Sequence, residues 1–209
     1  MSTMNVLICQ QPKELVWKQR EIPIPGDNEA LIKIKSVGIC GTDIHAWGGN
    51  QPFFSYPRVL GHEICGEIVG LGKNIADLKN GQQVAVIPYV ACQQCPACKS
   101  GRTNCCEKIS VIGVHQDGGF SEYLSVPVAN ILPADGIDPQ AAALIEPFAI
   151  SAHAVRRAAI APGEQVLVVQ PPYPVATEAE MDSFALFDQM MNAPHPKYLK
   201  RGEIPAFEM

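Results

Sequence analysis

A cluster of four cysteines, three of them regularly spaced, constrains this chain more than any other feature of its sequence. Cys92, Cys95 and Cys98 follow one another at three-residue spacing, and Cys106 lies eight residues beyond Cys98. Thiolates at this spacing can surround three sides of a tetrahedral ion, and a fourth thiolate from a short return loop closes the shell. Four sulfur ligands with no open position describe a structural zinc site. Zinc is then expected to contribute folding free energy to a loop that has almost no core of its own.

An iron–sulfur cluster is the main alternative for these cysteines, because ferredoxins begin with the same Cys-x2-Cys-x2-Cys run. In that pattern a fourth cysteine follows after three residues and precedes a proline, whereas residue 102 is arginine here. The spacing therefore favours zinc. Cys105 could replace Cys106 as the fourth ligand. Unrelated free thiols are the remaining interpretation, and so regular a spacing disfavours it.

Composition and charge exclude several classes of protein. With 209 residues, 47% of them apolar, the chain can bury a sizeable core. The formal net charge of −5 and the lack of basic runs argue against nucleic acid or an anionic membrane surface as partners. We see neither a secretory signal nor an apolar run approaching ~18 residues, so the sequence predicts no membrane span. We expect a cytoplasmic protein, whose eight cysteines are then better explained by metal than by disulfides.

A second set of metal-binding side chains is spread over three segments. Cys40 lies in residues 38–45, His62 and Glu63 follow a glycine, and Glu146 precedes a proline. Each residue alone is weak evidence, because a buried cysteine is most often a small hydrophobic residue. Together they offer one thiolate, one imidazole and one or two carboxylates. Three protein ligands with an open fourth position are typical of a catalytic zinc.

The first half of the chain is expected to be rich in strands. Short segments with β-branched residues and turn punctuation suggest a closed or partly closed barrel. The segments expected to form strands are 4–9, 14–22, 30–38, 64–71, 83–88 and 120–123. The alternation of apolar and polar residues over 30–35 has the period of a half-buried strand. Residues 141–144 and 149–159 favour helices, with a break near Pro147.

The C-terminal part follows a different pattern. Residues 166–169 read as a compact apolar strand, but residues 170–174, Gln-Pro-Pro-Tyr-Pro, break the chain immediately afterwards. A capping box at residues 177–180 predicts a short amphipathic helix over 179–192. We therefore predict a mainly β domain with some α over residues 1–169, and a proline-rich, partly helical tail over 170–209.

Taken in order, the motifs resemble those of the zinc-containing medium-chain dehydrogenases. They are Gly-x-Cys-Gly-Thr-Asp-x-His, Gly-His-Glu, the four-cysteine lobe, Asp-Gly-Gly-Phe-Ser-Glu-Tyr and Ile-Glu-Pro. The sorbitol, threonine and sugar-acid dehydrogenase branches are more similar than the ethanol branch, which has a cysteine ligand where this chain has Glu-Pro. The resemblance covers residues 1 to about 169. It implies a GroES-like barrel with a structural-zinc lobe and two zinc ions per chain.

The resemblance also implies roles for individual residues. Cys40 and His62 would bind the catalytic zinc, with Glu63 and Glu146 as carboxylates that bind directly, through water or in exchange. The lobe cysteines Cys92, Cys95, Cys98 and Cys106 would bind the structural zinc. Thr42 matches the hydroxyl residue that touches the substrate alcohol, and His45 the outer end of the proton relay. Asp43 matches the residue that orients the histidine ligand.

The chain departs from the family where a nicotinamide cofactor would bind. In the family a strand like 166–169 leads into a Gly-x-Gly-x-x-Gly turn, whose backbone approaches the pyrophosphate. The proline-rich residues 170–174 stand there instead, and the only glycine after Gly163 is Gly202. About forty residues cannot build a Rossmann domain. We expect no residue of this chain to bind NAD(P) in the family's way.

Two functions of different classes remain. The first is a zinc-dependent oxidoreductase domain acting on a small alcohol, polyol or sugar acid, inactive alone because the dinucleotide-binding domain is absent. The second is a zinc-stabilised, non-enzymatic binding or regulatory module. A zinc hydrolase using Glu63 as base ranks last, because no oxyanion-stabilising device is visible. The sequence leaves the oligomeric state open, a homo-oligomer included.

Overall fold

The computed structural model describes residues 2–52, 54–161 and 163–166. The strands are β1 Thr3–Gln11, β2 Glu14–Glu21, β3 Glu29–Gly38, β4 Arg58–Val59, β5 Glu63–Leu71, β6 Gln83–Val86, β7 Tyr89–Val90, β8 Ser110–Val111, β9 Tyr123–Pro127 and β10 Ile131–Pro133. The helices are α1 Gly41–Gly48, α2 Pro96–Lys99, α3 Pro139–Ala143 and α4 Ile145–Ala158, with 3-10 turns at Thr103–Cys105 and Val128–Asn130.

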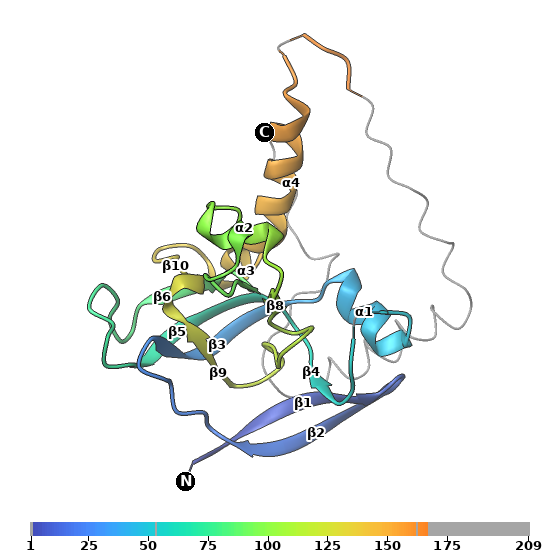
Figure 1. Cartoon of the computed structure of the whole chain (residues 1–209). Coiled ribbons are helices and arrows are strands. Elements are labelled where there is room, and N and C mark those ends of the chain that lie inside the picture. Colours follow the sequence, from blue (N-terminus) through green and yellow to red (C-terminus); the bar gives the residue numbers. More distant parts are fainter. Residues whose placement is uncertain (1, 53, 162, 167–209) are drawn as a thin grey trace.

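Two antiparallel sheets form the body of the molecule (Figure 1). The larger sheet has the order β10-β6-β5-β3-β9, and the smaller one the order β2-β1-β4. The segment just before β9 joins them, because the Leu7 N–H donates to the Phe120 carbonyl and Val6 bridges Ser121. This arrangement is a partly closed barrel, which confirms the mainly β fold expected from the sequence.

Alternation along β3 shows how the sequence forms this barrel. Ala30, Ile32 and Ile34 face the core and are buried, whereas Lys33 and Lys35, which each follow a buried isoleucine, are exposed. Removing one isoleucine side chain from water contributes roughly 1.5–3 kcal/mol. The same core is filled from the other strands and from α1, and its largest fully buried side chains include Phe120, Leu7, Ile8, Leu60, Ile64 and Ile68.

The helices after the barrel differ from the prediction at one point. The interruption lies at Leu144, and Pro147 is inside α4 rather than at a break. Proline is tolerated in a first helical turn, because the backbone N–H groups there have no partner inside the helix. The Asp138 carboxylate caps α3 by accepting hydrogen bonds from the N–H groups of Gln140 and Ala141.

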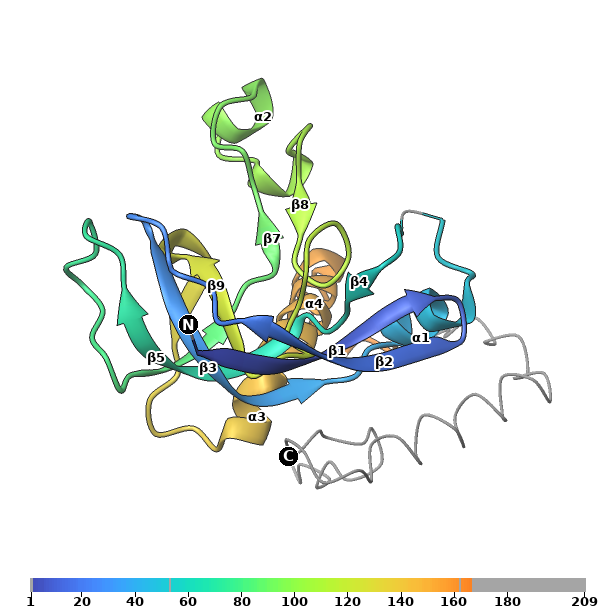
Figure 2. The ribbon, with the colours of Figure 1, turned by 90° about the horizontal axis from the view of Figure 1, so that it is seen from below.

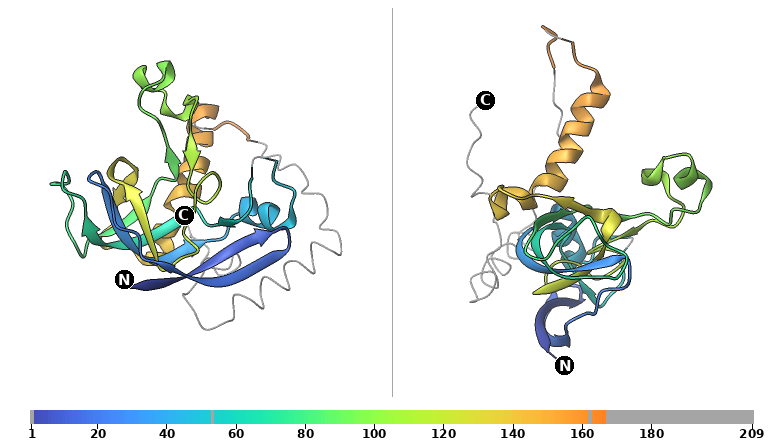
Figure 3. Two further views of the ribbon diagram at one scale, coloured as in Figure 1. Left: turned by 60° about the horizontal axis from the view of Figure 1, so that its bottom comes forward. Right: turned by 90° about the vertical axis from the view of Figure 1, so that its left-hand side faces the viewer.

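α4 extends away from both sheets (Figures 1 and 3). None of its residues is buried, and Phe148 is 72% exposed. In the part of the chain that the structure describes, no helix combines the length and apolar character needed to cross a membrane.

Three other expected elements differ from the structure or extend beyond the residues that it describes. The strand expected at 120–123 begins only at Tyr123, because the preceding residues form the junction between the sheets instead. The expected strand at 166–169 is described only at Val166, which is not in a strand. The expected helix at 179–192 lies outside the described residues, as does the rest of the proposed tail.

A small lobe stands apart from the barrel (Figure 2). It is carried by the two-stranded ribbon β7–β8, in which Tyr89 pairs with Val111 and Val90 with Ser110. Between the two strands the chain contains α2 and the cluster of four cysteines.

Candidate metal centres

The four lobe cysteines converge on one point. The sulfur atoms of Cys92, Cys95, Cys98 and Cys106 all lie within 4.8 Å of one another, and those of Cys92 and Cys98 are 4.0 Å apart. Four sulfurs at the usual Zn–S distance of about 2.3 Å would stand about 3.8 Å apart in a tetrahedron. The donor set and its spacing therefore fit a structural zinc ion.

The local backbone explains why these sulfurs meet. Cys95 is the N-cap of α2, with Pro96 at the first helical position, so Cys98 is brought back toward it within one turn. The Cys106 sulfur accepts hydrogen bonds from the N–H groups of Cys92, at 3.3 Å, and Lys108, at 3.4 Å. Cys105 is exposed and outside the group. The structure thus selects Cys106 over Cys105 as the fourth member.

Electrostatics also favour a cation among these thiols. The backbone N–H groups of Gln94 and Cys95, with the Cys106 thiol, lower the pKa of Cys92 to about 6. Burial and the neighbouring thiols raise the pKa of Cys98 to about 12. Four thiolates therefore cannot share this volume without a compensating charge. A bound divalent ion would supply that charge and release the remaining protons.

The second group forms where β3 ends and β5 begins. Cys40 is the N-cap of α1, directly after β3, while His62 and Glu63 lie at the start of β5. One ligand atom from each of these three residues lies within 4.8 Å of the others. His62 and Glu63 are buried and Cys40 is half-buried. Thiolate, imidazole and carboxylate with room for a fourth ligand fit a catalytic type of zinc site.

Gly38 provides the space for Glu63. The two residues are cross-strand partners in the β3–β5 pair. A Cβ atom at Gly38 would stand 2.0 Å from Oε2 of Glu63 and 2.9 Å from its Cβ. The carboxylate therefore occupies a place that any other residue at position 38 would fill. Sequence reasoning missed this role, because only the strand register shows which residue lies opposite Glu63.

Asp43 ties the pieces of this site together. Its carboxylate accepts hydrogen bonds from the N–H groups of Cys40 and Gly61, both at 2.9 Å. The same carboxylate lies 3.8 Å from Nδ1 of His62, which is buried and without a hydrogen bond. Burial raises the pKa of Asp43, and the nearby His62 and the two backbone N–H groups oppose that rise. Asp43 thus aligns the loops that carry Cys40 and His62.

Negative groups surround the His62 imidazole. Burial lowers the pKa of His62, but the contact with Cys40 and the charges of Asp43, Cys40 and Glu146 outweigh it and raise the pKa to about 9. A thiol and carboxylates surround this imidazole, and a divalent cation bound among them would neutralise their negative charge. The observation supports the fit of a metal ion to this group.

Glu146 lies at the edge of this site rather than inside the three-residue group. It is in the first turn of α4, and its Oε1 accepts a 2.6 Å hydrogen bond from the Tyr89 hydroxyl. Burial, this hydrogen bond and the charges of Glu146, Cys40 and Glu63 raise the pKa of Tyr89. The hydroxyl therefore stays protonated and donates. Sequence reasoning missed Tyr89, which precedes Cys92 without belonging to any ligand pattern.

The two residues expected to relay a proton lie on α1. The Thr42 hydroxyl is 3.7 Å from the Cys40 sulfur. His45 is half-buried and follows Thr42 by three positions, so the two side chains share one face of the helix. The structure thus places Thr42 beside the metal group and His45 one turn farther away.

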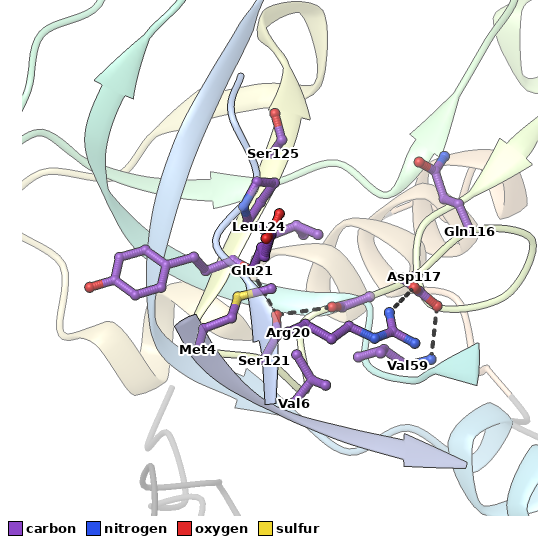
Figure 4. A pocket seen from close by; sticks show the side chains of 13 residues that line it. Met4, Val6, Arg20, Glu21, Val59, Gln116, Asp117, Ser121, Leu124 and Ser125 are labelled. Atoms are coloured by element: carbon purple, nitrogen blue, oxygen red, sulfur yellow. Dashed lines mark hydrogen bonds and ion pairs between the residues drawn. The ribbon is translucent and has the colours of Figure 1, made fainter. Parts of the chain in front are cut away.

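A separate cavity of about 320 Å³ lies between the β1–β2 hairpin and residues 116–125 (Figure 4). At its edge Arg20 and Asp117 form a 2.7 Å ion pair, and Asp117 also accepts a hydrogen bond from the N–H of Val59. None of the residues lining the cavity belongs to either metal group.

Comparison with known proteins shows which family this chain is related to. The model of the alcohol dehydrogenase GroES-like domain matches residues 26–136. The starvation-sensing protein RspB of Escherichia coli K12 is 41% identical over 167 residues, which are 79% of this chain and 49% of that protein. An L-threonine 3-dehydrogenase of Legionella pneumophila is 37% identical over 171 residues, covering 79% and 50%.

The fold of this chain is also similar to that of a solved dehydrogenase structure. The crystal structure of galactitol-1-phosphate dehydrogenase from Escherichia coli superposes with a TM-score of 0.71 at 33% identity, covering 75% of this chain and 45% of that one. The chain thus spans about half the length of the curated relatives that it matches. The chain belongs to the alcohol dehydrogenase GroES-like domain family, the catalytic-domain type of the zinc-type medium-chain dehydrogenases.

Proposed function

We propose that this chain is a zinc-dependent oxidoreductase domain whose parent chemistry is the oxidation of a secondary alcohol in a polyol or sugar acid. The observation that carries the proposal is the Cys40–His62–Glu63 group, which offers three ligand atoms of the catalytic type within 4.8 Å of one another. The relatives support a small molecule with a hydroxyl group as substrate, since they include enzymes named for threonine and for galactitol 1-phosphate.

In this proposal Cys40, His62 and Glu63 hold the catalytic zinc, with Glu146 as a further carboxylate beside it. When bound there, zinc supplies Lewis acidity to an alcohol oxygen. The Thr42 hydroxyl, next to Cys40, is placed to accept the hydrogen bond of the alcohol. In a complete relay the proton would pass from Thr42 through a cofactor hydroxyl toward His45, which lies one turn farther along α1.

The lobe has a different part in the same proposal. Cys92, Cys95, Cys98 and Cys106 hold a second zinc with no open position, so that ion has no contact with substrate. Its contribution is to order the lobe and with it the ribbon β7–β8. A chain of this kind would carry two zinc ions with separate roles.

The residues of this chain do not fit the nicotinamide cofactor that the family uses. Proline lacks the N–H groups that a pyrophosphate needs, and residues 170–174 contain three prolines. We therefore assign no hydride-transfer step to this chain and expect it to be inactive alone. The same observation favours a second candidate, a zinc-stabilised binding or regulatory module that has kept the site and lost the reaction.

Zinc analysis of the purified chain tests the proposed metal sites. We expect two zinc ions per chain in the unmodified protein and one in the Cys40→Ser variant, because that change removes a ligand from the three-residue group only. The Cys105→Ser variant is the matched control and should retain two, since Cys105 is exposed and outside both groups. One zinc or fewer in the unmodified chain, or substantial iron, would contradict the proposal.

A further inference from the structure

Tyr89 links the zinc lobe to the candidate catalytic site. Its hydroxyl donates a 2.6 Å hydrogen bond to Oε1 of Glu146, while its backbone belongs to β7, the strand that leads into the lobe. The phenol lies near the metal group, because it interacts electrostatically with Cys40 and Glu63. One side chain therefore connects a strand of the lobe with a carboxylate whose charge acts on His62.

Of the two partners in this hydrogen bond, Tyr89 has the backbone that is more firmly held. Tyr89 pairs with Val111 across the ribbon. The Asn130 amide donates to the carbonyl of Tyr89 at 3.1 Å and to that of Ile87 at 2.7 Å. These contacts hold the strand on both sides of the phenol. The backbone of Tyr89 is thus held in place, and its side chain carries the hydroxyl toward Glu146.

The side chain of Glu146 is the partner whose direction can change. It is half-buried in the first turn of α4, a helix in which no residue is fully buried, so packing alone does not fix the direction of its side chain. Its charge acts on His62, yet it is not a member of the group formed by Cys40, His62 and Glu63. The hydrogen bond from Tyr89 is therefore the contact that holds this carboxylate beside the group.

We propose that Tyr89 is a positioning residue that keeps Glu146 out of the inner ligand set of the metal bound by Cys40, His62 and Glu63. The inference rests on the proposed function. Cys40 and Glu63 already balance a divalent charge when ionised, and a third anion would give the site a net negative charge. It would also occupy the fourth position, which a catalytic zinc keeps for water or substrate. Holding Glu146 aside keeps that position available.

Cobalt binding to the full chain tests this role without any measurement of activity. The catalytic site is emptied with a chelator and titrated with Co²⁺, whose visible absorption reports the number and type of its ligands. The proteins compared are the unmodified chain, Tyr89→Phe, Glu146→Gln and the double variant. Tyr123→Phe serves as control, because Tyr123 lies on β9 and belongs to neither metal group.

We expect Tyr89→Phe to bind Co²⁺ ~10-fold more tightly, an effect of the size typical of groups that orient ligands, with a shifted visible spectrum as Glu146 takes the fourth position. Adding Glu146→Gln should restore the original affinity and spectrum. Unchanged binding in Tyr89→Phe, or a change that persists in the double variant, would overturn the role of Tyr89 alone. Absence of a thiolate-to-cobalt band in the unmodified chain would instead overturn the proposed metal site and this inference with it.

Discussion

A single missing side chain makes room for the carboxylate of Glu63, a candidate metal ligand. Gly38 lies opposite Glu63 in the β3–β5 pair, and a Cβ there would stand 2.0 Å from the Glu63 carboxylate. We therefore predict that Gly38→Ala displaces Glu63 and weakens zinc at the Cys40–His62–Glu63 group by about 10- to 100-fold. Zinc analysis after dialysis should give one ion per chain. Gly41→Ala is the matched control, since nothing lies within 4 Å of its added atom; two zinc ions in Gly38→Ala would refute the steric argument.

Burial decides which thiols can react. Burial and the charge of Glu14 raise the pKa of Cys9 to about 12, so its thiolate fraction at pH 8 is about 10⁻⁴ and increases only as the pH rises toward that value. Cys105 is exposed. Brief treatment of the zinc-loaded chain with iodoacetamide should label Cys105 and spare Cys9, as read by peptide mass spectrometry. Labelling of Cys9 at the rate of Cys105 would show that the core is open at β1.

Among the structural elements, the lobe depends most on its metal. Apart from its cysteines it contributes only a few apolar side chains, among them Ala91, Ala97 and Ile109. We predict that Cys95→Ser lowers the free energy of unfolding by about 3 kcal/mol, or roughly 6–12 °C in melting temperature for a chain of this size. Cys40→Ser should change the melting temperature by less than about 3 °C, because the barrel core beside it is intact.

The lobe prediction has a local readout as well. Limited proteolysis of Cys95→Ser should cut between β7 and β8, whereas Cys40→Ser should resist cleavage there. Equal melting losses in the two variants, or protection of the lobe in Cys95→Ser, would show that packing rather than zinc orders this element.

For the whole molecule, we predict that the chain binds neither NAD nor NADP tightly and turns over no polyol or sugar acid. The reason is the proline-rich stretch 170–174, which lacks N–H groups for a pyrophosphate. Reaction would also need the nicotinamide held against the alcohol, and diffusion does not replace that positioning. Calorimetry at millimolar cofactor measures this directly. Micromolar affinity, or turnover near the ~1 s⁻¹ of ordinary enzymes, would mean that a cofactor site is completed in another way.

The sequence by itself determined the parts of this protein that depend on local chemistry. Thiol spacing indicated the lobe group, and the alternation in β3 indicated a strand with one buried face. The position of Pro147 was misjudged, because a proline is equally compatible with a break and with a first helical turn.

The tertiary structure decided what depends on distance through space. It selected Cys106 over Cys105 and showed that Gly38 accommodates Glu63. It also showed that Glu146 accepts a hydrogen bond from the Tyr89 hydroxyl and lies outside the group of Cys40, His62 and Glu63. Such contacts join residues far apart in the chain, and their geometry comes from strand register and barrel closure. Local residue patterns carry the chemistry of a ligand, whereas the fold determines which ligand atoms reach the same point.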